Sequence, residues 1–390
     1  MIDRNKPFLS PESVAASFGV ATDMAYGSVA PPLYLTSTYE FAGYDQPRLY
    51  DYGRAGNPTR DLLGDALAAL EGGAGCVITS SGMAALDLLI GRLGPDDLVL
   101  APHDCYGGTM RLLKARASRR HCSVRFVDQS DDGEVSAALE EVPALVLIET
   151  PSNPLMRVVD IAALAAKAKE VGAAVAVDNT FLSPAVQRPI ALGADYVIHS
   201  TTKYLNGHSD VIGGAVVASE HGNAQELRQW ANIVGSAGAP FDAWLTLRGL
   251  RTLFPRMRTQ QTNAMAVATY LEGHAAVSKV HYPGLSRHPG HTIAARQQDG
   301  FGAMLSFELA GGIDAVRRFI QHVKFITLAE SLGGVESLVA HPATMTHADM
   351  GAEARTVAGI SDGLLRLSIG LEAEQDLITG LECGLAECGS

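Results

Sequence analysis

The sequence predicts an α/β fold in which a large, mostly parallel sheet is followed by a smaller C-terminal α+β domain. From about residue 61 to about residue 203, short apolar runs rich in β-branched residues alternate with helical stretches. This alternation is typical of βαβ crossovers around a buried parallel sheet. After about residue 256 the strands become fewer and mix with helices. The chain also has 40 glycines, which cluster at turns between apolar runs, as close backbone approach to a ligand would require.

The chain has 390 residues, which is too long for one ordinary core. Residues 1–60 show weak periodicity and many prolines and tyrosines, so we expect an arm that lies on another surface. We expect residues 61–255 to form the large α/β domain and residues 256–390 to form the smaller α+β domain.

The expected elements follow one another in a regular order. Strands are expected in the first part at 76–82, 98–104, 124–128, 144–149, 174–181 and 194–200. Helices are expected between them at 60–73, 83–94, 106–117 and 160–173. Later helices are expected within 225–253 and at 256–272, 313–323 and 374–387, with strands at 278–283, 302–310, 325–331 and 364–370.

Composition excludes several classes of function. A formal net charge of −12 argues against a nucleic-acid partner, because such partners need a basic face. No apolar run approaches the roughly 18 residues of a membrane span, and the N-terminus has no long apolar segment of a signal peptide. The five cysteines include no CxxC pair and are odd in number, so a disulfide framework is not expected. We expect a cytoplasmic protein.

Lys203 is the first candidate for chemistry. It follows an apolar run and the hydroxyl series Ser200-Thr201-Thr202. Burial lowers the pKa of a lysine, and such an amine is suited to Schiff-base formation, while the hydroxyls are suited to binding a phosphate. The alternative is a solvated lysine at the start of a loop, which is the usual case for lysine.

Two other segments have the same position after a predicted strand. Asp178 ends the run AVAVD, where its carboxylate could hold a protonated pyridine nitrogen and make a pyridoxal-phosphate (PLP) ring an electron sink. It could equally cap a helix. Ser81-Gly82-Met83 joins a strand to a helix, where backbone amides could bind phosphate. Such a turn can also serve only for tight packing between the strand and the helix, without binding a ligand.

Together these residues resemble the Cys/Met-metabolism family of PLP enzymes. The resemblance covers about Pro31 to Leu377, and its most specific part is the segment from Asp195 to Ser209, DYVIHSTTKYLNGHS. It implies PLP as cofactor and the aspartate-aminotransferase-like fold (fold type I). It also implies active sites shared between two subunits and a homotetramer built as a dimer of dimers.

The resemblance implies a role for each matching residue around the cofactor. Lys203 would form the Schiff base, Asp178 would bind the pyridinium nitrogen, and Tyr106 would stack on the ring and assist proton transfer. The phosphate would be bound by Gly82, Met83, Ser200 and Thr202, and by Tyr52 and Arg54 from the neighbouring subunit. Tyr106 could instead be a packing aromatic, and Tyr52 and Arg54 could be solvated residues of the arm.

The resemblance also implies how substrates bind. Asn153 and Arg366 would hold the α-carboxylate, with Ser331 as an adjacent contact. Arg366 interrupts an apolar strand pattern, where an unpaired guanidinium would be costly, so an anionic partner is expected. The candidates for contacts to the distal ends of the substrates are Glu330, Arg111 and Asp51. The twelve histidines include no HExxH or tight ligand cluster, so no metal site is expected.

The implied reaction is γ-replacement, in which L-cysteine displaces succinate from O-succinyl-L-homoserine and L-cystathionine forms. The implied process is methionine biosynthesis by transsulfuration. Two alternatives share almost all of these residues: γ-elimination of cystathionine, and γ-replacement with sulfide. A protein of this fold that binds PLP without turnover is a further alternative. Relatives that catalyse γ-replacement often carry a second arginine where this chain has Ala55, which leaves the acyl group of the donor open.

Overall fold

The computed structural model describes residues 9–351, 355–356 and 358–389. These residues form two compact units, each made of two chain segments. The first unit comprises residues up to Arg92 together with Asp195–Pro255, and the second comprises Leu93–Ala194 together with the chain from Arg256 onward. The three-part division expected from the sequence stays a prediction.

The described part of the first unit contains three strands and five complete helices. The strands are β1 (Gly75–Thr79), β6 (Tyr196–His199) and β7 (Gly214–Ala218). β7 runs antiparallel to both β1 and β6. The helices are α1 (Pro11–Ser17), α2 (Pro58–Glu71), α3 (Gly82–Ile90), α7 (His221–Val234) and α8 (Pro240–Leu250). Every residue of the three strands is buried, which explains why their sequences are apolar apart from the terminal Thr79 and His199.

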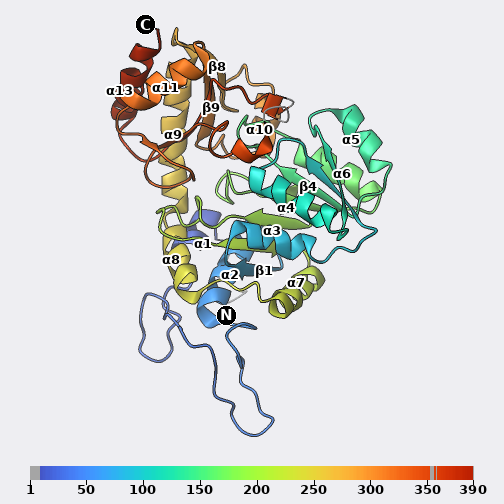
Figure 1. Ribbon diagram of the computed structural model, residues 1–390. Helices are drawn as coiled ribbons and strands as arrows, with labels where there is room; N and C mark the ends of the chain where they lie inside the picture. The colour runs from blue at the N-terminus through green and yellow to red at the C-terminus, as the bar shows by residue number, and fades with distance from the viewer. Residues whose placement is uncertain (1–8, 352–354, 357, 390) are drawn as a thin grey trace. The chain divides into compact units, whose positions relative to one another are not determined.

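Residues 20–56 of the first unit contain no helix and no strand beyond two isolated bridges. Figure 1 shows this segment as a long loop near the N-terminus, drawn in blue. Several of its large apolar side chains are almost fully exposed, among them Met24 (96%), Tyr26 (95%), Tyr44 (100%) and Leu49 (90%). A single chain therefore leaves the apolar residues of this arm in water.

The second unit begins with the parallel strands that the alternating sequence pattern predicts. β4 (Leu145–Glu149) pairs in parallel with β2 (Leu98–Pro102) and β5 (Ala174–Asp178), and β2 pairs in parallel with β3 (Ser123–Val127). The connecting helices are α4 (Gly107–Ser118), α5 (Asp132–Leu139) and α6 (Ile161–Glu170), followed by the short 3-10 turn η1 (Pro189–Leu192). Helix α5 was not expected from the sequence. Its eight residues are too few for a clear helical period.

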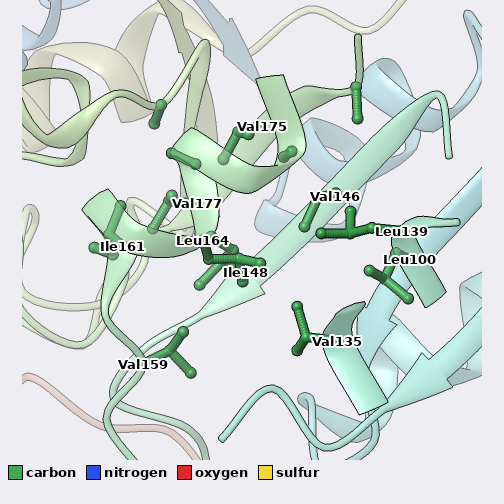
Figure 2. Close-up of a cluster of buried hydrophobic side chains, with 14 of the residues drawn as sticks. Leu100, Val135, Leu139, Val146, Ile148, Val159, Ile161, Leu164, Val175 and Val177 are labelled. Carbon is green, nitrogen blue, oxygen red and sulfur yellow. The ribbon is translucent and has the colours of Figure 1, made fainter. Parts of the chain in front are cut away.

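The core of this parallel region is formed by side chains from the strands and from two helices. Val146 and Ile148 of β4 pack with Val175 of β5, Val135 of α5 and Leu164 of α6, as Figure 2 shows. Each of these side chains is at least 95% buried. Burial of a side chain of this size stabilises the fold by about 1.5–3 kcal/mol, so the packing of this core holds the carboxyl ends of β4 and β5 side by side.

The rest of the second unit is built on a five-stranded sheet. The strand order is β10 (Thr327–Leu328), β11 (Leu338–Ala340), β12 (Leu364–Ser368), β9 (Met304–Leu309), β8 (Val277–His281). Its helices are α9 (Leu253–Glu272), which begins in the first unit, α10 (His291–Gln297), α11 (Gly312–His322) and α13 (Glu374–Leu385), with the 3-10 turns η2 (Ala348–Met350) and η3 (Ala386–Gly389). β11 was not expected from the sequence.

Helix α9 begins two residues before Pro255, whereas the sequence suggested a start after it. The difference has a simple cause, because proline is tolerated in the first turn of a helix, where its missing N–H has no intrahelical partner. Within the second unit Gln260 Nε2 donates to the carbonyl oxygens of Gly334 (2.8 Å) and Ile369 (3.0 Å). The long helix is thus hydrogen-bonded to loops next to the five-stranded sheet.

Two helical glycines of the first unit provide a matched test of packing. A Cβ on Gly249 of α8 would lie 2.1 Å from the carbonyl oxygen of Asn206, whereas a Cβ on Gly222 of α7 would meet nothing within 4 Å. We expect Gly249→Ala to lower the free energy of unfolding by about 3 kcal/mol, because the clash is with backbone. We expect Gly222→Ala to be neutral or stabilising by about 0.5 kcal/mol. Chemical denaturation of both variants measures this, and equal stabilities would contradict the close approach.

Candidate active site

The N-terminus of α3 in the first unit presents two unpaired backbone N–H groups. Ser81 caps the helix, since its Oγ accepts a hydrogen bond from the amide of Ala84 (3.0 Å). The amides of Gly82 and Met83 make no hydrogen bond with any other residue in the described part of the chain. Unpaired amides at a helix N-terminus favour an anion such as a phosphate.

The hydroxyl series expected to bind the same phosphate begins next to this turn. A Cβ on Gly82 would lie 2.8 Å from the Cβ of Ser200, so only glycine leaves space between them. Thr202 Oγ1 donates to the carbonyl of Gly213 (3.2 Å) and accepts from its amide (3.0 Å). The one hydroxyl hydrogen of Thr202 is therefore already used, and donation to a phosphate would require the hydroxyl to rotate.

Lys203 lies in the compact turn that follows β6. Its amide donates to the carbonyl of Ser200 (3.2 Å), and its own carbonyl accepts from the amide of Gly207 (2.8 Å). The side chain is half-buried, less than its position after a buried strand suggested. At the end of β6, His199 Nε2 lies 2.6 Å from Glu71 Oε1, and both side chains are buried. Breaking such a buried pair is costly, so it holds the start of the lysine turn.

The arm places Tyr52 and Arg54 together. The Arg54 guanidinium lies 5.5 Å from the centre of the Tyr52 ring, and its Nε donates to Asn232 Oδ1 (3.1 Å). Asp51 Oδ1 accepts from the amide of Tyr52 (2.6 Å). Asp51, Tyr52, Arg54 and Ala55 are all exposed, which fits residues that act on a neighbouring surface.

In the second unit, a buried carboxylate links two of the expected loops. Glu149 ends β4 and is the register partner of Asp178, which ends β5. Glu149 Oε2 accepts from the amide of Tyr106 (2.8 Å), and its Oε1 accepts from the amide of Asn153 (3.0 Å). Burial, followed by repulsion from Asp178, raises the pKa of Glu149 well above its ordinary value. The Glu149 side chain thus positions Tyr106 and the start of the Asn153 loop, while the pairing of β4 with β5 places Asp178 beside it.

The expected carboxylate-binding residues also meet in the second unit. Arg366 is 3% exposed; its Nη1 donates to Asn153 Oδ1 (2.9 Å) and its Nη2 to the carbonyl of Ser331 (3.0 Å). Ser331 has a φ of 88°, a strained value for a residue other than glycine. These two contacts are to neutral oxygens and hold the guanidinium in place. Arginine can present further N–H donors to a carboxylate.

His347 is a residue of this cluster that the sequence did not single out. The distance from its Nε2 to the carbonyl oxygen of Asn153 is 3.1 Å. Burial and the nearby positive charge of Arg366 lower the pKa of His347 to about 4, so it is neutral near pH 7. Arg366 and His347 therefore hold Asn153 by its side chain and by its backbone.

A second network supports the loop that ends at Tyr106. Asp104 Oδ2 accepts from Ser152 Oγ (2.7 Å) and from Arg157 Nη1 (2.8 Å). The same Arg157 nitrogen lies 3.1 Å from His103 Nε2. Because His103 Nδ1 lies 3.2 Å from the carbonyl of Val127, Nδ1 carries the hydrogen and Nε2 accepts from Arg157. The network ties the residues before Tyr106 to the residue before Asn153.

Sequence reasoning missed Glu149, Arg157 and His347 as parts of the site. Glu149 had a usable signal, since it is a carboxylate at the end of an apolar strand, as Asp178 is. Arg157 and His347 had none, because their partners are distant in sequence. Two predicted contacts to the distal ends of substrates, Arg111 on α4 and Glu330 before Ser331, are exposed in the second unit.

The expected site residues fall into two groups. The first unit brings together Gly82, Met83, Ser200, Thr202 and the Lys203 turn, and the second brings together Tyr106, Asn153, Asp178, Ser331 and Arg366. The combined constellation stays a prediction. The first group fits a phosphate through the two unpaired amides and the space beside Gly82. The second fits a pyridinium nitrogen and a carboxylate through Asp178 and Arg366. Each group therefore fits its own part of PLP.

The described residues contain neither a candidate metal site nor a candidate membrane span. No group of three or more His, Cys, Asp or Glu side chains there could hold a metal ion. None of the described helices combines the length and the apolar character needed to cross a membrane.

Comparison with known proteins identifies the class. The model of the Cys/Met metabolism PLP-dependent enzyme family matches residues 12–386. The chain belongs to this family, so the resemblance inferred from the sequence is confirmed, and so are an enzymatic function and PLP as its cofactor.

Within this family, the chain is similar to the following individual proteins. Cystathionine gamma-synthase of Escherichia coli is 56% identical over 95% of this chain and 97% of its own length. Cystathionine beta-lyase of Lactococcus lactis is 46% identical over 93% of this chain and 96% of its own. The crystal structure of cystathionine gamma synthase from Xanthomonas oryzae pv. oryzae in complex with aminoacrylate and cysteine has a TM-score of 0.97 at 56% identity. It covers 98% of this chain and 99% of that one. The predicted fold type is thereby confirmed.

His347 makes the stability of the protein depend on pH. Its pKa is about 4 in the folded chain against an ordinary 6.5, so between these values the unfolded chain binds a proton that the folded chain does not. The wild type should therefore lose stability as pH falls from 6.5 to 4, by up to about 3 kcal/mol, relative to His347→Gln. Urea denaturation across this range measures the difference. The exposed His322→Gln serves as the control, and parallel pH curves for wild type and His347→Gln would contradict the burial of a neutral imidazole.

Proposed function

We propose that the chain catalyses γ-replacement, in which L-cysteine displaces succinate from O-succinyl-L-homoserine to form L-cystathionine. The observation that carries the proposal is the 56% identity with the E. coli synthase over 95% of the chain, against 46% with the Lactococcus lactis beta-lyase. In the cell this reaction would serve methionine biosynthesis by transsulfuration in the cytoplasm. Elimination of cystathionine, and replacement by sulfide, are the alternatives within the family.

The residues divide the work of this reaction. Bound PLP supplies an electron sink that acidifies the protons on Cα and Cβ of an amino acid. Lys203 anchors the cofactor, and its Nζ then removes and returns protons at Cα and Cβ. Asp178 would hold the pyridinium nitrogen protonated, and Tyr106 would stack on the ring and assist proton transfer. The amides of Gly82 and Met83, with Ser200 and, after rotation of its hydroxyl, Thr202, would hold the phosphate.

The substrates are oriented by the second group. Arg366, steadied by Asn153 and Ser331, binds the α-carboxylate of the amino acid whose γ-substituent leaves. γ-Replacement needs room for a second amino acid near Cγ. Glu330 and Asp51 would be anionic partners for its ammonium group, and Arg111 a cationic partner for a carboxylate. The exposed side chains of all three are compatible with contacts to ligands.

The ratio of two activities tests the proposed reaction. Formation of cystathionine from O-succinyl-L-homoserine and L-cysteine should have a higher kcat/KM than formation of α-ketobutyrate from cystathionine. The reason is that the proposed contacts for a second amino acid near Cγ are used only in γ-replacement. Product analysis on one enzyme preparation gives both values, and O-acetyl-L-homoserine tests the acyl group. A higher value for α-ketobutyrate formation would assign the chain to γ-elimination, and faster use of sulfide than of cysteine would assign it to sulfhydrylation.

We propose an active site shared between two subunits, which the exposed arm supports, in the homotetramer built as a dimer of dimers that the family resemblance implies. Its apolar side chains are exposed in the single chain, and an exposed apolar surface of this kind marks an interaction site. A neighbouring subunit would cover it, and Tyr52 and Arg54 would then reach the phosphate of that subunit's cofactor.

Mixed dimers test the shared site. Lys203→Ala should lose nearly all turnover and the visible absorption band of the bound cofactor, and Arg54→Ala should lose most of its activity through weakened phosphate binding. Co-expressed with different tags, the two variants should recover about a quarter of wild-type activity in the unseparated mixture, because about half of the dimers are hybrids and one of the two sites in each hybrid is intact. The separately purified variants are the controls. No recovery in verified hybrids would refute the shared site, and wild-type activity in Lys203→Ala would refute the role of the lysine.

A further inference from the structure

The second unit contains a cavity of about 730 Å³ that is lined by none of the predicted site residues. Its walls come from β8, from the turn that leads into α10 and from the segment after Asn153. Leu155, Val158 and Leu285 line it and are each at least 92% buried. The cavity therefore has an apolar part and the volume of a small-molecule site.

The lining of this cavity carries a net positive charge, whereas the chain as a whole is negatively charged. Its lining includes Arg157, Lys279 and Arg287 but only one carboxylate, Glu272, whereas the whole chain has a net charge of −12. Lys279 and Arg287 are exposed and form no ion pair or side-chain hydrogen bond with other described residues. Cations of this kind in a net acidic protein attract anions locally.

His288, another lining residue, has a lowered pKa to which neighbouring positive charges contribute after burial. Its Nδ1 accepts from the amide of Gly290 (3.0 Å). Burial, with added repulsion from His281, His291 and Lys279, lowers the pKa of His288 to about 4. Burial disfavours a charge of either sign, but the added repulsion among these positive groups would be relieved by a bound anion.

Arg157 connects the cavity to the site. Its side chain is 30% exposed, lines the cavity and donates from Nη1 to Asp104 (2.8 Å). Asp104 also accepts from Ser152, so it contacts the loops of both Tyr106 and Asn153. An anion in the cavity would compete with Asp104 for Arg157 and thereby change the support of these loops.

We propose that this cavity binds a small organic anion, a carboxylate or phosphate with an apolar part, and that its binding changes the affinity of the site for amino acids through Arg157. The first statement is independent of the proposed reaction, and the second rests on the proposed binding of an α-carboxylate by Arg366. Coupling between two sites of this kind typically changes affinity about fivefold or more.

Calorimetric titration of the PLP-loaded enzyme with phenyl phosphate tests the binding. Lys279→Gln/Arg287→Gln should raise the Kd at least about tenfold, as expected for loss of charged hydrogen-bond donors. The control Arg317→Gln/Lys324→Gln, which removes two exposed cations elsewhere in the second unit, should bind as the wild type does, and benzyl alcohol should not bind. No binding to the wild type, or equal Kd values for the two double variants, would overturn the site.

A second measurement tests the coupling without turnover. The visible absorption band of the bound cofactor reports the Kd of L-alanine, and saturating phenyl phosphate should shift this Kd about fivefold or more in the wild type and the control but not in Lys279→Gln/Arg287→Gln. An unchanged Kd in the wild type would overturn the coupling. Because the readout needs no succinyl chemistry, failure of the proposed reaction alone would leave the predicted shift intact.

Discussion

The buried carboxylate of Glu149 connects the parallel core of the second unit to the loops that carry the expected site residues. The hydrophobic packing of β4 and β5 brings the ends of both strands together, and Glu149 then binds the amides of Tyr106 and Asn153. An isolated buried carboxylate would be costly. Here its two oxygens each accept a backbone hydrogen bond, so the cost of burial is partly offset while two loops are held. Tyr106 and Asn153 depend on this arrangement directly, and Arg366 is linked to it through Asn153.

Asn153 links Glu149 to the five-stranded sheet, because it contacts both Glu149 and Arg366. Arg366 of β12 binds its side chain, and the buried His347 contacts its carbonyl. A neutral imidazole next to a guanidinium avoids repulsion between two cations, which explains why the local field and burial together keep the proton off. Arg366 is thereby presented in a single orientation, which is the condition for recognising a carboxylate by two parallel hydrogen bonds.

In the first unit, glycines allow backbone segments to approach one another closely. Gly82 packs against Ser200, and Gly249 packs against the carbonyl of Asn206, so the turn that contains Lys203 has neighbours on two sides that admit no side chain. The buried pair of His199 and Glu71 secures its beginning. Backbone amides and one lysine are therefore held by packing, whereas the second unit holds its residues mainly by buried hydrogen bonds.

The sequence by itself determined the α/β class, the order of most strands and helices, and the family. These are local properties. The alternation of hydrophobic residues and the family motif around Lys203 can each be recognised within a few tens of residues. It also placed Asp178 at the end of one strand and Lys203 after another, where ligands bind in such sheets. The tertiary structure alone decided that Glu149 positions Tyr106, that His347 contacts Asn153 and that Arg157 lies between a cationic cavity and Asp104. The physical reason is separation along the chain: Arg366 and Asn153 are 213 residues apart. The burial and hydrogen bonds that define such contacts exist only after the chain has folded.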